Sequence, residues 1–177
     1  TPSTQVWNPS TDIQAHKALH FGIDNYYSVK DNKDNPYAFP TDVGITYGAF
    51  PWLEVGADVL YPSEKPLYFN AKVGIPEKGM IPAVAGGIFN MGTKKDVTDY
   101  NIWYGVAAKT FGRAGRVTLG GYSGNKKLYV NELGEENNTG FIAAWDKYLM
   151  KKLWASIDYA SGDNSYGSLS YGVSYNF

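Results

Sequence analysis

The residues nearest to a catalytic set are two histidines, His16 and His20, and the carboxylate of Asp24. His20 and Asp24 share one face of a segment with alternating hydrophobicity, but on an extended strand they stand about 13 Å apart. A general base has to lie within hydrogen-bond reach of its partner, so this pair does not form a dyad. We therefore predict no catalytic residues and expect that the protein is not an enzyme.

Metal-ligand patterns are equally weak. His16 and His20 have the i, i+4 spacing that suits one face of a helix, but a strand holds them too far apart for one ion. The acidic clusters "DNKDN" (31–35) and "ELGEENN" (132–138) offer oxygen ligands for surface calcium, although solvated loops explain them better. The absence of cysteine excludes disulfides, Cys-based zinc sites, iron–sulfur clusters and covalent c-type haem. We predict no metal site and no cofactor.

Composition excludes several further classes. The 177 residues carry a net charge of −1, so nothing indicates a nucleic-acid partner. No run reaches the roughly 18 apolar residues of a transmembrane helix. The start, "TPSTQVWNPS", lacks the basic and apolar regions of a signal peptide, and we expect a processed chain from which that peptide has been removed. The 15 Tyr, 5 Trp and 20 Gly suit strands with one large apolar face and one small face.

Apolar residues alternate with polar or small residues along most of the chain, and this period of two predicts β-strands. About ten strands of roughly nine to eleven residues are expected, which is the length that crosses a bilayer at a tilt. We therefore predict an all-β fold, an up-and-down antiparallel transmembrane β-barrel over residues 16–177. Residues 1–15 lack the pattern and are expected to form a lead-in or a strap in the lumen. The expected strands are 17–29, 42–50, 53–61, 67–75, 82–91, 100–109, 116–124, 139–147, 153–161 and 168–177.

The connections between the expected strands also alternate. Long polar connections, such as 30–40 and 125–138, alternate with tight ones such as "PW" at 51–52. Long loops at one end and tight turns at the other are typical of outer-membrane barrels. Aromatic residues gather near both ends of the strands, as in the two interface belts of membrane proteins. The expected belt residues include Trp52 and Trp145 at the tight-turn end, and Tyr61, Tyr159, Tyr26, Tyr27, Tyr100 and Tyr122 at the long-loop end.

The polar face of the expected strands is small and carries isolated charges. Glycines such as Gly22 and Gly44 lie on it, and a narrow lumen needs small residues where a water-facing surface does not. We therefore expect the polar face to line the lumen and the apolar face to meet lipid, with Trp103 inside and Ile102 outside. Unpaired buried charges are costly, so ion pairs across the lumen are expected. The expected lumen-lining residues are His20, Asp24, Glu54, Asp58, Lys72, Lys109, Asp146, Lys152 and Asp158.

The final eight residues, "SYGVSYNF", resemble the C-terminal assembly signal of bacterial outer-membrane β-barrels. The family pattern is a polar residue, any residue, Gly, two residues of any kind, an aromatic, any residue and a final aromatic. The specified positions are occupied by Ser170, Gly172, Tyr175 and Phe177. The resemblance implies recognition by the barrel-assembly machinery and closure of the last strand against the first. It also implies a location in the bacterial outer membrane, with outer-membrane lipid and lipopolysaccharide as partners.

Three internal stretches, "VWNPSTDIQ", "TDVGITYG" and "LYFNAKVGIPE", resemble a family of small porin-like outer-membrane proteins, some of them longer. The chain is then either a shorter member or a fragment, and the resemblance implies no activity. The strand number is similar to that of omptin-type proteases, which use acidic pairs and an Asp–His pair at the extracellular rim. Both histidines of this chain lie towards the periplasmic end instead. Barrel lipid hydrolases need a Ser–His pair exposed to lipid, whereas His20 is expected to point inward.

The sequence leaves several functions open. The first is a narrow pore or channel for water, ions or very small solutes. The second is a closed structural or interaction barrel that binds through loops 30–40 and 125–138, because small barrels are largely filled by side chains. A membrane-embedded hydrolase is the least favoured. A soluble barrel or sandwich, with the apolar face as its core, has the same alternation and is the alternative to the membrane assignment.

Overall fold

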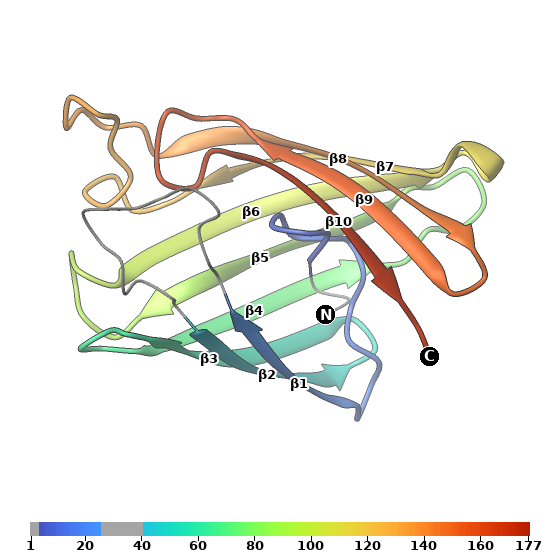
Figure 1. The fold of residues 1–177 in the computed structure, drawn as a ribbon, viewed down its shortest axis with the longest axis horizontal. Helices are drawn as coiled ribbons and strands as arrows, with labels where there is room; N and C mark the ends of the chain where they lie inside the picture. Colours follow the sequence, from blue (N-terminus) through green and yellow to red (C-terminus); the bar gives the residue numbers. More distant parts are fainter. Residues whose placement is uncertain (1–3, 26–40) are drawn as a thin grey trace.

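The computed structural model describes residues 4–25 and 41–177. These residues form ten β-strands in one antiparallel sheet, and each strand pairs with its neighbours in the sequence. The predicted all-β, up-and-down arrangement is therefore confirmed, and β1 and β10 are the two ends of the strand order (Figure 1). The strands are β1 (Leu19–Asn25), β2 (Thr41–Phe50), β3 (Leu53–Tyr61), β4 (Leu67–Ile75), β5 (Ala83–Gly92), β6 (Asp99–Thr110), β7 (Arg116–Ser123), β8 (Thr139–Met150), β9 (Leu153–Ala160) and β10 (Ser168–Tyr175).

The hairpins that join the strands differ at the two ends of the sheet. Two residues, Pro51 and Trp52, separate β2 from β3, and two more separate β8 from β9. The turn between β6 and β7 contains a short 3-10 helix, η1 (Gly112–Ala114), flanked by Gly115 with φ of 100°. A left-handed φ of this kind favours glycine, which has no Cβ to clash. The connections at the opposite end are longer, as residues 124–138 and 161–167 show (Figure 1).

No helix in the described ranges is long and apolar enough to cross a membrane.

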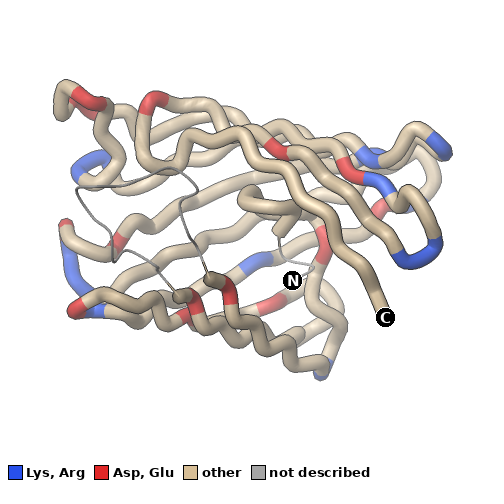
Figure 2. The backbone as a smooth tube through the Cα atoms, viewed as in Figure 1, with Lys and Arg blue, Asp and Glu red and all other residues tan. Residues whose placement is uncertain are grey.

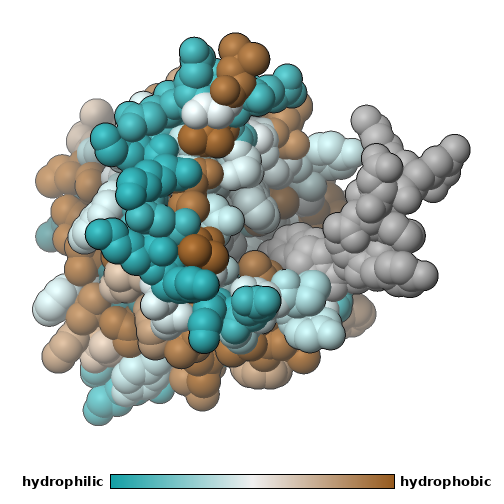
Figure 3. Space-filling model, turned by 90° about the vertical axis from the view of Figure 1, so that its left-hand side faces the viewer, coloured by the Kyte–Doolittle hydropathy of each residue, from teal (hydrophilic) through white to brown (hydrophobic). Residues whose placement is uncertain are grey.

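Burial follows the strand period of two, so one face of the sheet is packed and the other exposed. On β7, Thr118 and Tyr122 are buried, whereas Val117 and Leu119, on either side of Thr118, are exposed. The sheet curls so that the packed face is concave and surrounds the N-terminal segment (Figure 1). On the outer face, hydrophobic residues dominate the flanks of the molecule, and hydrophilic residues cover its long-loop end (Figure 3).

Strand β6 departs from the predicted orientation. Ile102 is completely buried and Val106 nearly so, whereas Trp103 is 62% exposed. The expectation that Ile102 faces outward and Trp103 inward was therefore wrong. Ile102 belongs to an apolar cluster on the concave face, together with side chains such as Tyr122 and Ile142. Apolar packing on this side outweighs the tendency of an interior face to be polar, because it removes more apolar area from water.

The N-terminal segment, residues 4–18, is called the strap below. It leaves the concave face beside the end of β2, where the backbone N–H of Lys17 donates to the carbonyl of Gly48 at 2.7 Å. The N–H of Gly48 donates in turn to the carbonyl of Ala18 at 3.1 Å. A Cβ at Gly48 would collide with the carbonyl oxygens of Gln14 and Ala15. Glycine is therefore required where the strap backbone reaches the sheet.

Candidate functional site

The candidate site is the concave face of the sheet, where buried charges hold the strap and border a cavity. Charged residues otherwise gather towards the ends of the hairpins, and few lie along the middle of the strands (Figure 2). The charged residues of the concave face come from β1, β2, β3, β4, β7, β8 and β9, at positions fixed by the alternation of each strand. Their partners decide what the interior can do.

Asp158 on β9 is the main attachment point of the strap. One carboxylate oxygen, Oδ2, accepts the backbone N–H groups of Val6 at 2.7 Å, Trp7 at 2.9 Å and Asn8 at 3.2 Å. The other oxygen, Oδ1, accepts from the side-chain Nδ2 of Asn8 at 3.0 Å. Asp158 is 1% exposed, so these four bonds replace its water. Successive backbone N–H groups form an anion-binding concavity, and hydrogen bonds to a carboxylate are about twice as strong as neutral ones.

The long-loop end adds a second contact to the same part of the strap. The hydroxyl of Tyr166 donates to Oδ1 of Asn8 at 2.8 Å, and both residues are buried. The ring of Tyr166 packs edge-on against Tyr122, with centroids 4.6 Å apart. Burial without a charged partner raises the pKa of the Tyr166 hydroxyl, and the nearby charge of Asp158 acts in the same direction. The hydroxyl therefore stays protonated and remains a donor.

Arg116, at the start of β7, clamps the middle of the strap to the sheet. Its Nη1 lies 2.7 Å from Oδ1 of Asp12 on the strap, and its Nε lies 2.8 Å from Oδ1 of Asp146 on β8. Trp154 Nε1 donates to the second oxygen of Asp146 at 3.2 Å. One guanidinium thus bridges two carboxylates, which is a geometry that its fixed fork of donors favours.

Glu54 and Lys72 form a third buried group, close to the tight-turn end. The two residues are direct partners in the ladder between β3 and β4. Lys72 Nζ lies 3.1 Å from Oε1 of Glu54, and Oε2 accepts the backbone N–H of Gln14 on the strap at 2.7 Å. The interior charges are therefore paired, but between neighbouring strands and with the strap, whereas the expected ion pairs across the lumen are not found among the described residues.

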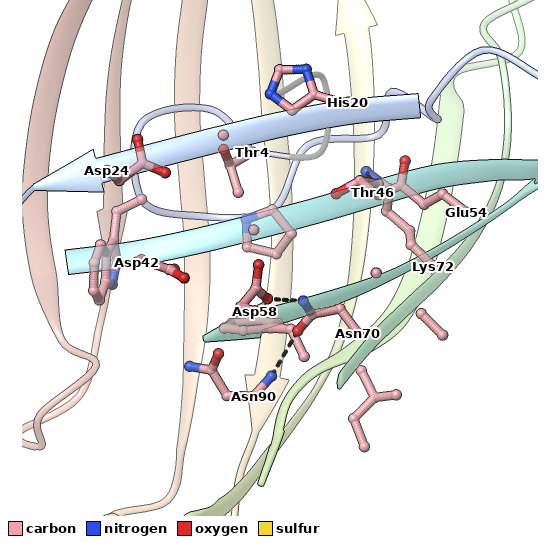
Figure 4. A pocket seen from close by; sticks show the side chains of 18 of the residues that line it. Thr4, His20, Asp24, Asp42, Thr46, Glu54, Asp58, Asn70, Lys72 and Asn90 are labelled. Atoms are coloured by element: carbon pink, nitrogen blue, oxygen red, sulfur yellow. Dashed lines mark hydrogen bonds and ion pairs between the residues drawn. The ribbon is translucent and has the colours of Figure 1, made fainter. Parts of the chain in front are cut away.

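A cavity of about 520 Å³ remains between the strap and the wall made by β1–β4. Its lining is mostly polar: Asp58 accepts a hydrogen bond from Asn70, whose own Oδ1 accepts the backbone N–H of Asn90 at 3.0 Å (Figure 4). Asp24 and Asp42 lie close enough to one another and to Asp58 for their charges to interact. Within the described residues, no Lys or Arg forms an ion pair with these three carboxylates. The cavity therefore has an acidic wall.

The structure places most of the predicted lumen residues on the concave face. Glu54, Lys72, Asp146 and Asp158 are buried there, and three more border the cavity, namely His20, Asp24 and Asp58. Two predictions were wrong. Lys109 lies on the same face of β6 as the exposed Trp103, and its Nζ pairs with Glu77 in the β4–β5 turn at 2.6 Å. Lys152 is exposed in the tight turn between β8 and β9.

The structure also locates the histidines that were considered for catalysis and metal binding. His16 is exposed, and its ring stacks on Phe50 with centroids 6.4 Å apart, whereas His20 borders the cavity. Among the described residues, no group of three or more His, Asp or Glu side chains is arranged to hold a metal ion. The acidic stretch 31–35 and loop 30–40 lie outside the described residues. Lys126 forms an ion pair with Glu136 in the same connection, and Lys127 forms one with Asp96 in the β5–β6 connection.

The expected belt residues divide into two groups. Trp52, Trp145, Tyr61 and Tyr159 are exposed on the outer face or in a turn. Tyr122 is buried in the aromatic cluster of the concave face, and Tyr100 packs against that cluster through Tyr129, so the expectation that they join a belt was wrong. Tyr26 and Tyr27 lie outside the described residues.

The residues of the C-terminal pattern divide by face as the strand period requires. Ser170 and Gly172 point to the concave side of β10, where Val6 of the strap lies against Gly172. Tyr175 and Phe177 are exposed, and their rings contact edge-on with centroids 5.3 Å apart.

Sequence reasoning missed several residues of this site, among them Asn8, Asp12, Asp42, Arg116 and Tyr166. Asp42 and Arg116 stand at the first or second position of a strand, on its polar face, and that placement was an available signal. No local pattern marks Asn8 or Asp12, because their partners lie about 100 to 160 positions away in the sequence.

Comparisons of the chain with protein-family models, with curated proteins and with solved structures found no match.

Proposed function

We propose that the chain is a small outer-membrane β-barrel with a narrow polar passage for water, ions or very small solutes along the wall of β1–β4. The observation that carries the passage is the cavity of about 520 Å³ between that wall and the strap. Residues 4–7 and Pro9 of the strap form one side of this cavity, and strand residues such as Asp42, Asp58 and Asn70 form the other. Its acidic wall favours cations over anions.

The outer face of the sheet supports the membrane location. On β10, Leu169, Tyr171 and Val173 are 66%, 81% and 74% exposed, and on β1 the outward residues Leu19, Phe21 and Ile23 are similarly uncovered. Contiguous exposed apolar surfaces of this extent are rare on soluble proteins. In a bilayer the lipid chains contact the same surface, so it does not have to be buried against protein.

Closure of β10 against β1 is part of the proposal. Both strands stand at the ends of the strand order, with one edge each that is not joined to another described strand. In hydrocarbon, each unsatisfied backbone N–H or C=O group of an unpaired strand edge costs roughly several kcal/mol. A membrane location therefore requires these edges to pair. The C-terminal pattern supports delivery by the barrel-assembly machinery, with lipid and lipopolysaccharide around the finished barrel.

A closed structural or interaction barrel is the second candidate, and the strap is the observation that favours it. Its attachments at Asp158, Arg116 and Glu54 keep polypeptide in the interior. In that case the long-loop end, including residues 125–138, would provide the binding surface. The proposal assigns no catalytic reaction.

The proposal is tested by single-channel recording of the refolded protein in a planar bilayer. We expect a small, cation-selective conductance whose selectivity falls when two cavity carboxylates are neutralised in Asp42→Asn/Asp58→Asn. Asp163→Asn, in the exposed β9–β10 connection, is the matched control and should leave selectivity unchanged. A protein that inserts and folds but carries no current would favour the closed barrel. Good solubility in plain buffer, without insertion into detergent or lipid, would overturn the membrane location.

A further inference from the structure

Polar contacts, rather than apolar packing, attach the strap to the concave face. Its buried residues are Gln5, Asn8, Pro9, Ser10, Thr11 and Gln14, and all of them except Pro9 are polar. Its largest apolar side chains, Trp7, Ile13 and Val6, are not fully buried, and Val6 and Trp7 remain more than one-third exposed. The strap therefore contributes little apolar burial to the fold, and apolar burial is the dominant force that holds a folded chain together.

The strap is also nearly independent of the backbone ladders. Within the described residues, its bridge to the sheet joins His16 to Gly48, and a second bridge, from Thr4 to Pro9, is internal to the strap. The strands pair continuously with one another without it. Displacing residues 4–14 would therefore leave every strand ladder intact.

Asp158 is the strongest single attachment of the part of the strap that borders the cavity. Three backbone N–H groups and one side-chain amide bind its carboxylate, and Gln5 to Trp7 form one side of the cavity. An amide at position 158 would keep the shape of the side chain. It would lose the charge and turn one acceptor into a donor that faces N–H groups.

We propose that the strap is a displaceable plug, latched to β9 by Asp158, whose release widens the passage along β1–β4. The inference rests on the proposed passage for its effect on conductance, but the latch itself is a statement about the position of the strap. A first measurement therefore reports on that position without requiring current.

The first measurement uses the absence of native cysteine. Ser10→Cys places a thiol on a strap residue that is 1% exposed. We expect slow labelling by a water-soluble maleimide, accelerated at least tenfold when Asp158→Asn is added. Asp58→Asn is the matched control, because Asp58 faces the same interior but bonds to Asn70 rather than to the strap. An unchanged labelling rate in the Asp158 variant would overturn the latch.

The second measurement locks the plug in place. A Cβ at Gly172 would lie 4.0 Å from Cβ of Val6, within the range of about 3.5–4.5 Å found in disulfides. The pair Val6→Cys/Gly172→Cys should therefore cross-link the strap to β10 on oxidation. We expect a low, steady conductance in the oxidised state and a larger one with openings after reduction, whereas Val6→Cys alone shows no redox dependence. Equal conductance before and after reduction would contradict a displaceable plug.

The outcomes separate the two proposals. If labelling accelerates in Asp158→Asn while no variant conducts, the latch stands and the passage fails. Heat-modifiable migration in gels establishes that each variant has folded. If Asp158→Asn does not fold, Asn8→Ala gives a milder variant, because it removes the side-chain hydrogen bond from Asn8 to Oδ1 of Asp158 and leaves the carboxylate in place. Unchanged labelling in that folded variant would again count against the latch.

Discussion

Lys72 and Glu54 face each other on adjacent strands with their charged atoms 3.1 Å apart, and both side chains are almost completely buried. The same carboxylate accepts a backbone N–H from Gln14, so one ion pair joins β3, β4 and the strap. Two opposite charges removed from water depend on each other, because neither is solvated alone. This relationship makes the pair a sensitive probe of the interior.

Removal of one member of the pair should destabilise the protein strongly. Lys72→Met leaves the Glu54 charge buried without its ammonium, and we expect the free energy of unfolding to fall by about 3–5 kcal/mol. Urea titration in detergent, followed by tryptophan fluorescence, measures this. Lys126→Met is the control, because Lys126 and Glu136 are both more than 60% exposed, and its effect should stay below about 1 kcal/mol. Similar losses of unfolding free energy in both variants would show that water in the interior solvates Glu54.

The hydroxyl of Tyr166 should contribute measurably to stability through Asn8. Tyr166→Phe keeps the ring packing but leaves a buried amide oxygen of Asn8 without its donor, which costs about 1–3 kcal/mol. Tyr171→Phe on the exposed face of β10 is the matched control, with an expected change near zero. The two variants are compared by the same urea titration, and equal midpoints would contradict the contact.

The proposed membrane location predicts a cost for charge on the outer face. Val173 lies in the middle of β10 and is 74% exposed, so Val173→Arg should destabilise the lipid-embedded protein by about 2–4 kcal/mol. Leu133→Arg, in an exposed position of the long 124–138 connection, should be neutral. Folding titrations in vesicles measure both. If the two arginine variants behave alike, the outer face of β10 is not in lipid.

The β4–β5 turn should respond to acid through Glu77. The ammonium of Lys109, 2.6 Å away, and the N–H of Thr110 hold the pKa of Glu77 below its ordinary value of 4.5. A lowered pKa in the folded state means that the contribution to stability is present above about pH 4.5 and is lost as the pH falls through the folded pKa. Carboxyl NMR titration should show the low pKa, and Lys109→Gln should raise it. An ordinary pKa in the unsubstituted protein would remove the expected acid response.

The strands could be predicted from the sequence, because burial on a curved sheet repeats every two residues, as in β3 and β10. Orientation was predictable where small or charged residues marked one face along the middle of a strand. On β3, Glu54 and Asp58 identify the inner face, whereas β6 offers Ile102 on one face and Trp103 on the other. Both are apolar, so only the tertiary packing of Ile102 decides the orientation.

The errors and omissions at the site have a common physical origin. Lys109 and Lys152 stand at or beyond strand ends, where a long side chain can turn to a partner or to water whatever the parity of its position. The contact of Asp12 with Arg116 spans 104 positions. No periodicity carries information about which interior charge a non-repetitive segment will meet, so the strap's partners required the folded sheet.

The position of the strap also sets an order of events during folding. Hydrogen bonds join Val6, Trp7 and Asn8 to a residue about 150 positions later, and Val6 lies against β10, at the end of the strand order. All ten strands, in contrast, form hairpins with their immediate neighbours. Residues 6–8 therefore have to wait for β9 and β10 before they are anchored, and the sheet has to curl around them. Completion of the C-terminal hairpin is thus the moment at which the interior acquires its final contents.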